Sequence, residues 1–298
     1  MSPPEVFLVG STGYLGSALV PTLESHANRK EILLKLGVRS TSNKAINTHC
    51  EVVTLDFENV EQLASKFKGS DVIISVLRLK PDNIFIHNNI ALAASRARVK
   101  AYIPSQFSLD FRVTKYNHIM FDLKTNHKSY AQALGLKVIS IYNSAFLELS
   151  LSALLNIKDG NSEWSIVGKS SDPLSLISLV DLGHILVRIA IIVNEDPEKI
   201  PSDFRVCSDT HSYDDYASIV KKTFGRDIKI NAESIFSAEK RYNDGISDPN
   251  DEFFTTLKLI SSEHALDFSK DNLNNFINPN EKYFKWTKFD DYVEAANT

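Results

Sequence analysis

The feature that most constrains this chain is a short apolar run that ends in three glycines spaced three residues apart. Residues 6–9 read Val-Phe-Leu-Val, and Gly10, Gly13 and Gly16 follow. The run is typical of a buried parallel strand, and glycines let a strand-to-helix turn approach a phosphate without a Cβ in the way. A helix after the turn would aim its free N–H groups at that phosphate. The sequence therefore predicts a dinucleotide-binding turn, with the candidates Gly10, Thr12, Gly13, Tyr14, Leu15 and Gly16.

Two features of this turn leave an alternative open. Its spacing is G-x-x-G-x-x-G, whereas the common fingerprint is G-x-G-x-x-G, so an ordinary glycine-rich turn is the competing interpretation. Pro21 also lies inside the expected helix, where it should remove a hydrogen bond and kink the axis. The strand before the turn and the helical pattern after it favour the binding interpretation.

The composition predicts a soluble globular protein with a small partner. Of 298 residues, 43% are hydrophobic and 23% are charged, which suits one large domain or two closely packed ones. The net charge of −4, with scattered Lys and Arg, gives no sign of direct nucleic-acid binding. Cys50 and Cys207 lie far apart, which favours a reducing compartment. No signal-peptide or membrane-span pattern is present, so we expect a cytoplasmic location, with the nucleus as the alternative.

Strand and helix patterns alternate through the first half of the chain. Apolar strand candidates fall at residues 32–38, 51–55, 71–77, 101–104 and 137–142. Helical spacing marks residues 60–67, 84–98 and 120–134. This alternation predicts an α/β fold with a doubly wound parallel sheet of the Rossmann type, whose ligand crevice lies beyond the carboxyl ends of the strands.

The second half carries fewer signals. Short strands are expected at residues 164–168, 174–179 and 205–208. Helices are expected at residues 182–193, with Asp181 as the cap, and at residues 213–224, between Ser212 and Gly225. Residues 243–251 read as a polar loop.

The residues after the second strand indicate which cofactor the crevice takes. Arg39, Ser40 and Lys44 follow that strand, where an NAD-binding protein would favour an acidic residue for the ribose 2′-hydroxyl. A guanidinium and hydroxyl donors suit a 2′-phosphate instead, so these residues predict NADP(H). A solvated basic loop is the alternative.

The ends of the third and fourth strands add further candidates. Asp56 can accept a hydrogen bond from the adenine amine, and Phe57 can pack on the base edge. Asp56 is equally suited to cap the helix that begins near residue 60. By position, Ser75, Val76 and Leu77 are expected to pass beneath the nicotinamide ribose.

Several stretches together resemble the NmrA-like and isoflavone-reductase-like branch of the atypical short-chain dehydrogenases. They are the glycine turn at residues 10–16, Val38-Arg39-Ser40, residues 71–75, residues 102–107 (Tyr-Ile-Pro-Ser-Gln-Phe) and residues 121–124 (Phe-Asp-Leu-Lys). The resemblance covers about residues 5–150. It implies an NADP-binding Rossmann domain at residues 1–150, rejoined by about residues 175–210, and a smaller α/β substrate lobe within residues 151–298.

The resemblance also implies a catalytic lysine at Lys124, and cofactor contacts at Pro104, Ser105, Gln106 and Lys124. A lysine near a bound cofactor can hold the nicotinamide ribose and polarise a substrate oxygen, and partial burial lowers its pKa toward acid–base chemistry. A solvated lysine on an amphipathic helix is the alternative.

The chain departs from the reductase pattern at two positions. Where these reductases typically carry Pro-Ser-Glu-Phe-Gly, this sequence has Gln106 in place of the glutamate and Ser108 in place of the glycine. A Tyr-x-x-x-Lys dyad ending at Lys124 or Lys128 is also absent. Two hypotheses follow: an NADPH-dependent reductase of a small apolar or aromatic carbonyl, enone or quinone, and a non-catalytic NADP(H) sensor that acts on a protein partner. Without H-E-x-x-H or C-x-x-C motifs, we predict no metal site.

Overall fold

A computed structural model describes residues 2–39, 47–154 and 162–297 of the chain, and a five-stranded parallel sheet forms its centre. The strand order is β3-β2-β1-β4-β5, so the order reverses between β1 and β4. A reversal of this kind opens a ligand crevice at the carboxyl ends of the strands. The strands are β1 (Glu5–Val9), β2 (Leu33–Arg39), β3 (Glu51–Leu55), β4 (Val72–Ser75) and β5 (Ala101–Ile103).

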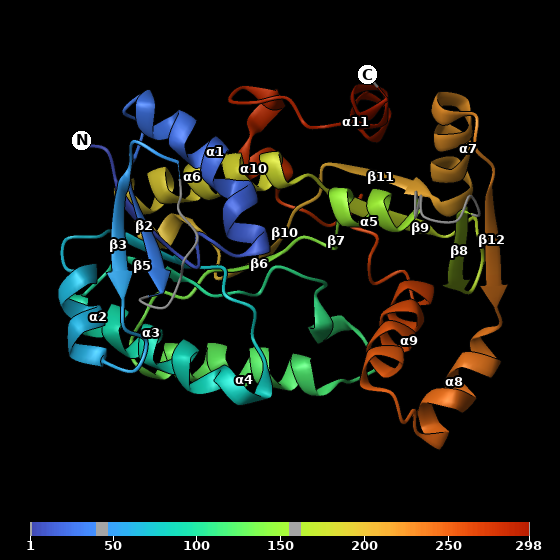
Figure 1. Cartoon of the computed structure of the whole chain (residues 1–298), viewed down its shortest axis with the longest axis horizontal. Helices are drawn as coiled ribbons and strands as arrows, with labels where there is room; N and C mark the ends of the chain where they lie inside the picture. The colour runs from blue at the N-terminus through green and yellow to red at the C-terminus, as the bar shows by residue number, and fades with distance from the viewer. Residues whose placement is uncertain (1, 40–46, 155–161, 298) are drawn as a thin grey trace.

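Helices cover both faces of this sheet (Figure 1). One face carries α1 (Tyr14–Asn28) and α6 (Leu179–Glu195), and the other carries α2 (Val60–Phe67), α3 (Ile84–Ala97) and α4 (Ile119–Ala133). Side chains of a strand alternate between the two faces, so Val6 and Leu8 of β1 join the core under α1 and α6. Phe7 and Val9 join the core on the opposite face. Burial on both sides explains why β1 is apolar at consecutive positions.

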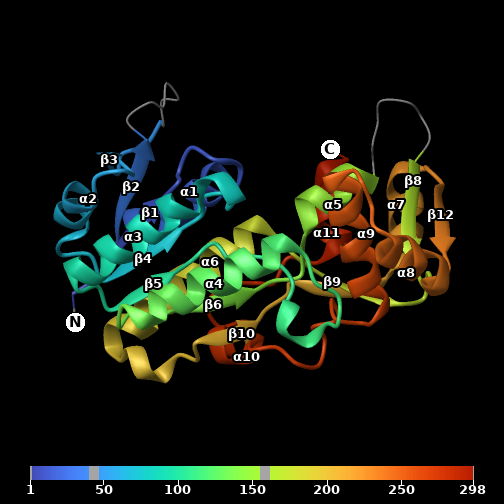
Figure 2. The same cartoon turned by 90° about the horizontal axis from the view of Figure 1, so that it is seen from below.

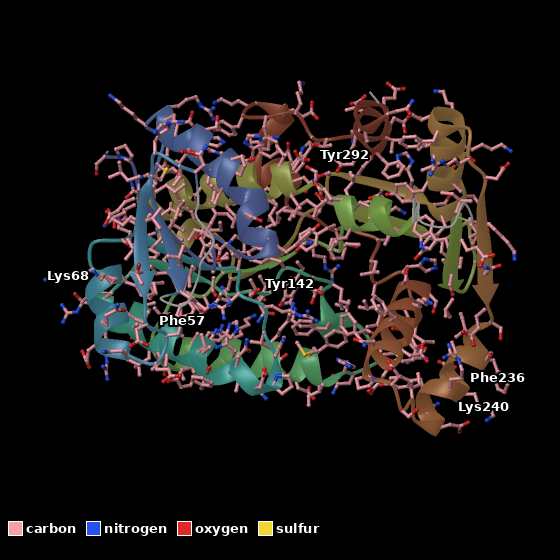
Figure 3. The ribbon with its side chains drawn as sticks, in the orientation of Figure 1. Phe57, Lys68, Tyr142, Phe236, Lys240 and Tyr292 are labelled. Atoms are coloured by element: carbon pink, nitrogen blue, oxygen red, sulfur yellow. The ribbon has the colours of Figure 1, made fainter. Side chains whose placement is uncertain are left out.

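The middle of the chain returns to this sheet region. β6 (Ser140–Tyr142) pairs in parallel with β10 (Asp203–Arg205), and an isolated bridge joins Tyr102 to Val138 beside β5. Tyr142 is 1% exposed and lies near the centre of the molecule in Figure 3. Its hydroxyl donates to Asp203 over 2.9 Å, which fixes β10 against β6.

The remaining elements form a smaller α/β part beside the sheet (Figure 2). β11 (Asp209–Ser212), β9 (Pro173–Ile177) and β7 (Ala145–Phe146) make one small sheet, and β12 (Ile228–Glu233) pairs with β8 (Ser162–Val167). The helices here are α5 (Leu147–Leu154), α7 (Tyr213–Phe224), α8 (Ile235–Asp244), α9 (Pro249–Ser262) and α11 (Phe289–Ala296). The short helix α10 (Asn274–Ile277) instead lies beside α6, and its Ile277 joins the core under α1 and α6. Short 3-10 turns occur at Pro81–Asn83, Phe111–Val113, Pro197–Lys199 and Pro279–Glu281.

The predicted elements are present, but several of their bounds differ. The strand expected at residues 174–179 ends at Ile177, because Leu179 already begins α6. Ser178, not Asp181, caps α6, because its side chain accepts from the Asp181 N–H and so adds one turn to the expected helix. The third short strand ends at residue 205, so residues 206–208 are not part of it. The polar stretch 243–251 is not one loop, because Asp248 caps α9 and Pro249 begins it.

The proline inside α1 does not end that helix. Pro21 is exposed, and α1 continues through it from residue 14 to residue 28. The carbonyl that Pro21 leaves without a donor belongs to Ser17, which is also exposed and open to solvent. Within residues 2–39, 47–154 and 162–297, no helix is both long and apolar enough to span a membrane.

Candidate functional site

The glycine turn is held tightly against the end of β2. The N–H groups of Gly10 and Ser11 point at the Gly37 carbonyl over 3.3 and 3.4 Å, and the Ser11 hydroxyl donates to the same oxygen over 2.9 Å. Gly10 has φ +94°, which L side chains rarely adopt. A Cβ on Gly16 would lie 2.2 Å from the Gly10 carbonyl oxygen. Gly10 and Gly16 are therefore required by backbone geometry before any ligand is considered.

The start of α1 offers free hydrogen-bond donors. Its N-cap, Gly13, provides no side-chain cap, and the first turn contains no acidic residue. In the described structure the N–H groups of Tyr14, Leu15 and Gly16 have no backbone partner. Thr12 is partly exposed beside them, and Tyr14 is 56% exposed. Free N–H groups and the positive end of the helix dipole together suit a phosphate.

The ends of β2 and β3 lie at the same edge of the sheet, because Arg39 pairs in register with Leu55. Arg39 is exposed and has no ion pair within the described ranges, whereas Ser40 and Lys44 fall outside the residues that the structure describes. Asp56 is exposed and accepts from the Glu58 N–H over 3.1 Å. It is not the cap of α2, because Asn59 accepts from the Gln62 N–H there.

Phe57 lies at this edge but turns inward. Its side chain is 7% exposed and packs in the core beneath α2 and α3 (Figure 3). Its carbonyl oxygen accepts from the Asn89 amide of α3 over 2.9 Å. The segment that follows β3 is therefore fixed to the helices on that face.

The ends of β4 and β5 complete the edge. Ser75 is fully buried, and its hydroxyl has no hydrogen-bond partner in the described structure. The Val76 N–H donates to the Val9 carbonyl over 3.0 Å, which continues the β1–β4 pairing to the glycine turn. Leu77 lies directly over that turn, since a Cβ on Gly10 would come within 2.8 Å of Leu77 Cδ2. Beyond β5, Pro104 is buried and Ser105 is partly exposed.

Gln106 connects the end of β5 to Lys124 in α4. Gln106 is 1% exposed, and its Nε2 donates to the Lys124 carbonyl over 2.8 Å, while its Oε1 has no partner in the described structure. One turn further along α4, Lys128 forms an ion pair with Asp203. These two contacts fix the turn of α4 that begins at Lys124.

The Lys124 ammonium is partly buried and unpaired. Within residues 2–39, 47–154 and 162–297 it has neither a hydrogen bond nor an ion pair. Desolvation by burial lowers the pKa of Lys124 to about 8. An amine with that pKa is mainly protonated at neutral pH and can release its proton readily, as a general acid must.

A buried polar cluster next to Lys124 is not visible in the sequence. His87, in the first turn of α3, is fully buried, and neither ring nitrogen makes a hydrogen bond of ordinary length. Its ring packs edge-on against His127, whose Nε2 lies 3.0 Å from the Tyr102 hydroxyl and whose Nδ1 lies 2.9 Å from the Asn88 amide oxygen. Burial, with a smaller contribution from the Lys124 charge, lowers the pKa of His87 to about 4. Spacing places His87 on the inner face of α3, but no motif marks it.

The smaller part of the molecule contributes one more wall beside the glycine turn. Glu148 in α5 accepts from the Leu179 N–H over 2.8 Å through Oε1, and its buried Oε2 has no partner in the described structure. Burial raises the pKa of Glu148. Burial, together with the Glu148 charge, also raises the pKa of Tyr14 and of Tyr292, which is labelled in Figure 3. Glu148 therefore marks the place where four helices meet, namely the starts of α1, α5 and α6 and the helix α11.

No cluster of His, Cys, Asp and Glu in the part of the chain that the structure describes could hold a metal ion. Cys50 and Cys207 are both free thiols. Among the described residues the edge presents backbone amides, hydroxyls, the Asp56 carboxylate, the Arg39 guanidinium and the Lys124 amine.

The family model for the NmrA-like family matches residues 4–293, nearly the whole chain. The chain belongs to the NmrA-like family. The match extends well past the residues that carry the resemblance in the sequence, which stop at about residue 150. No curated protein matches the sequence.

Solved structures share the fold of this NmrA-like protein. An isoflavone reductase superposes with a TM-score of 0.77 at 19% identity, over 99% of this chain and 100% of that one. NmrA, described as a negative transcriptional regulator, gives 0.73 at 18% identity over 98% and 95% of the two chains. An NADPH-dependent quinone oxidoreductase from Escherichia coli, complexed with NADPH, gives 0.72 at 15% identity over 98% and 100%. At these identities the likeness confirms the predicted Rossmann-type fold.

Proposed function

We propose that this protein is an NADPH-dependent reductase of a small apolar or aromatic carbonyl, enone or quinone. The observation that carries the proposal is the unpaired, partly buried amine of Lys124, fixed through Gln106 at the sheet edge that also holds the glycine turn. The similar structures of an isoflavone reductase and a quinone oxidoreductase support this class of reaction.

The residues of the edge fit an NADP(H) molecule. Three free N–H groups at the start of α1 suit the pyrophosphate, and the exposed Gly13 has no Cβ to obstruct its approach. Arg39 stands where an acidic residue would be needed for a bare ribose, so its guanidinium would hold the 2′-phosphate. The rest of the NADP(H) molecule would lie along the edge, next to Asp56, Ser75 to Leu77 and the segment 104–106. Their placement on consecutive strand ends supports this assignment.

NADPH, when bound, supplies a hydride from its nicotinamide ring. The Lys124 ammonium donates a hydrogen bond to the substrate oxygen and stabilises the negative charge that develops on it. Lys124 Nζ then gives its proton to that oxygen and regains one from solvent. Gln106 holds the backbone of Lys124 in place, and the buried face of α3 with His87 excludes water behind it. The lobe within residues 151–298 would bind the substrate, with about residues 175–210 rejoining the cofactor domain.

Steady-state NADPH oxidation with a panel of quinones, enones and aromatic aldehydes tests this function. We expect Lys124→Met to lower turnover by roughly 100-fold or more, because the loss of a general acid costs about 10²–10⁴-fold. NADPH affinity, measured by calorimetry, should stay within a few-fold. Lys240→Met is the matched control, since Lys240 is exposed on α8, away from the sheet edge (Figure 3). Unchanged turnover of Lys124→Met on a true substrate would remove Lys124 from the mechanism.

The second candidate is a sensor of NADP(H) that regulates a protein partner without turnover. The replacement at Gln106 favours it, because the amide is used to hold the Lys124 carbonyl instead of presenting a carboxylate. The similarity to NmrA, a negative transcriptional regulator, is consistent with this role. A sensor requires that partner affinity depends on the bound nucleotide. If protein loaded with NADPH, loaded with NADP⁺ and empty binds every recovered partner equally, sensing is excluded.

A further inference from the structure

A cavity of about 670 Å³ lies at the other end of α1 from the glycine turn. The last turns of α1, the middle of α6 and the segment 282–284 line it, and this segment precedes α11 at the top of Figure 1. α1 has 15 residues, which separates its two ends by about 20 Å. The cavity is therefore distinct from the proposed cofactor crevice.

Two cations that line this cavity have no carboxylate partner in the described structure. The Arg188 guanidinium lies 3.5 Å above the centre of the Tyr283 ring, and its buried Nε makes no hydrogen bond. The Lys282 ammonium lies 5.3 Å from the same ring centre. The buried Nε is out of a ligand's reach, but the outer N–H groups of the Arg188 guanidinium make no hydrogen bond among the described residues and are available to an anion. Arg29, the third cation, is already paired with Glu31 over 2.8 Å.

Charge complementarity then indicates a dianion. Arg29 and Glu31 cancel, which leaves the Arg188 and Lys282 charges to be balanced. A phosphate monoester carries about two negative charges at neutral pH and accepts the forked hydrogen bonds of a guanidinium. A carboxylate would balance only one of the two.

A chain of hydrogen bonds leaves a further acceptor on His184, which lines the cavity. Glu31 Oε2 lies 2.6 Å from His26 Nδ1, and His26 Nε2 lies 2.8 Å from His184 Nδ1. Because a carboxylate only accepts, a neutral His26 carries its proton on Nδ1 and accepts from His184 at Nε2. An Arg29 nitrogen is 2.9 Å from the same Nδ1, but the Glu31 oxygen is closer and decides the tautomer. His184 Nε2 is left with a lone pair and no partner among the described residues.

The lone pair of His184 selects a hydroxyl donor on the ligand. Burial, followed by the neighbouring His26, lowers the pKa of His184 to about 4, so the ring is neutral at pH 7. Its ring stacks on Phe284 at 4.9 Å between centres, which fixes the direction of Nε2. A neutral imidazole nitrogen in this position accepts from an O–H group.

We infer that this cavity is a second ligand site, which binds a small phosphate monoester whose remainder carries hydroxyl groups. Arg188 and Lys282 hold the phosphate, and His184 Nε2 accepts from a ligand hydroxyl. The site uses none of the residues of the crevice, so it stands whether or not the proposed reductase function holds.

Calorimetric titration of the full chain with glucose 6-phosphate tests the site, in parallel with and without saturating NADPH. We expect one saturable site with and without NADPH, and roughly tenfold weaker binding after Arg188→Met or Lys282→Met, since one charged contact is worth about one decade of affinity. Lys285→Met is the matched control, because Lys285 is exposed and paired with Glu281 outside the cavity. Glucose, which lacks the charge, and phenyl phosphate, which lacks the hydroxyl groups, should both bind more weakly.

Three results would overturn the proposal. One is the absence of saturation by glucose 6-phosphate at about 10 mM, a concentration that detects even weak sites. Another is binding that Lys282→Met leaves unchanged; since Lys282 is exposed, this variant keeps the fold even if Arg188→Met does not. The third is binding that saturating NADPH abolishes, which would place the phosphate in the cofactor crevice.

Discussion

The replacement Gly16→Ala sets two physical effects against each other, and the structure decides between them. Helix propensity alone favours alanine over glycine by up to about 1 kcal/mol. The added Cβ, however, would lie 2.2 Å from the Gly10 carbonyl oxygen and 2.7 Å from Ser11 Cα. Both atoms belong to the backbone, so no side-chain rotation relieves the contact.

The clash can be relieved only by moving α1 away from the turn. Cβ contacts below 3.0 Å are essentially never observed, so the helix must shift by at least 0.8 Å from the 2.2 Å position. α1 is also tightly packed against α6, where a Cβ on Gly183 would come within 2.8 Å of the Thr22 side chain. Overpacking of this kind costs about 1–3 kcal/mol, and we place Gly16→Ala at about 3 kcal/mol because only backbone can yield.

Thermal denaturation of the free protein measures this cost. A loss of about 3 kcal/mol corresponds to a drop in Tm of roughly 6–12 °C for a chain of this size. Gly13→Ala is the matched control, because its Cβ would lie 3.3 Å from the same oxygen and its φ of −76° suits any L residue. We expect its Tm to fall by no more than about 3 °C, which corresponds to less than about 1 kcal/mol.

NADPH binding should be impaired by Gly13→Ala, the variant with the smaller effect on stability. The Gly13 Cβ would stand at the exposed N-cap of α1, in the path of a phosphate, so Gly13→Ala should weaken NADPH binding while the fold persists. A Tm for Gly16→Ala equal to or above that of the unmodified protein would refute the reasoning, because propensity would then outweigh the backbone contact.

Three further predictions concern the same edge of the sheet. Arg39→Ala should weaken NADPH binding by roughly tenfold or more and NADH binding by less than about twofold, by calorimetry at one ionic strength, because only the former has the 2′-phosphate; equal losses would contradict the assignment. Lys124→Met should raise the Tm below pH 8, because burial of the ammonium destabilises the fold there. Since the pKa of Lys124 is lowered to about 8, this gain in Tm should vanish as the pH rises from about 8 to the usual lysine value near 10.4. A gain that persists at high pH would exclude titration of Lys124 as its cause. Gln106→Glu should lower the free energy of unfolding by about 2 kcal/mol at pH 8, because a buried carboxylate cannot donate to the Lys124 carbonyl. Part of this loss should be recovered at pH 5, where a buried Glu with a raised pKa is protonated. Denaturation curves that coincide at the two pH values would argue against that contact.

The strongly periodic elements could be predicted from the sequence because their signals are local. Residues 60–67 and 213–224 form helices at the predicted bounds, and the first five strands appear in the predicted places. The start of α6 could not be predicted in the same way. Ser178 and Asp181 are both good caps, and only the direction of the Ser178 side chain toward the Asp181 N–H distinguishes them.

The smaller lobe shows where local signals fail. The stretch 243–251, which reads as a polar loop, contains the end of α8 and the start of α9, and β12 is stabilised through its pairing with β8, more than 60 residues away in the chain. Their stability comes from tertiary packing that a sequence window does not contain.

The sequence by itself determined the glycine turn, the alternation of strands and helices, the family and the position of Lys124, because each depends on residues close together in the chain. Only the tertiary structure decided the electrostatics. It left the Lys124 amine without a partner, buried His87 beside it, and brought Arg188 and Lys282 to one cavity far from the crevice. A pKa, an unpaired charge and a cavity depend on neighbours that are distant in sequence, and folding alone brings those neighbours together.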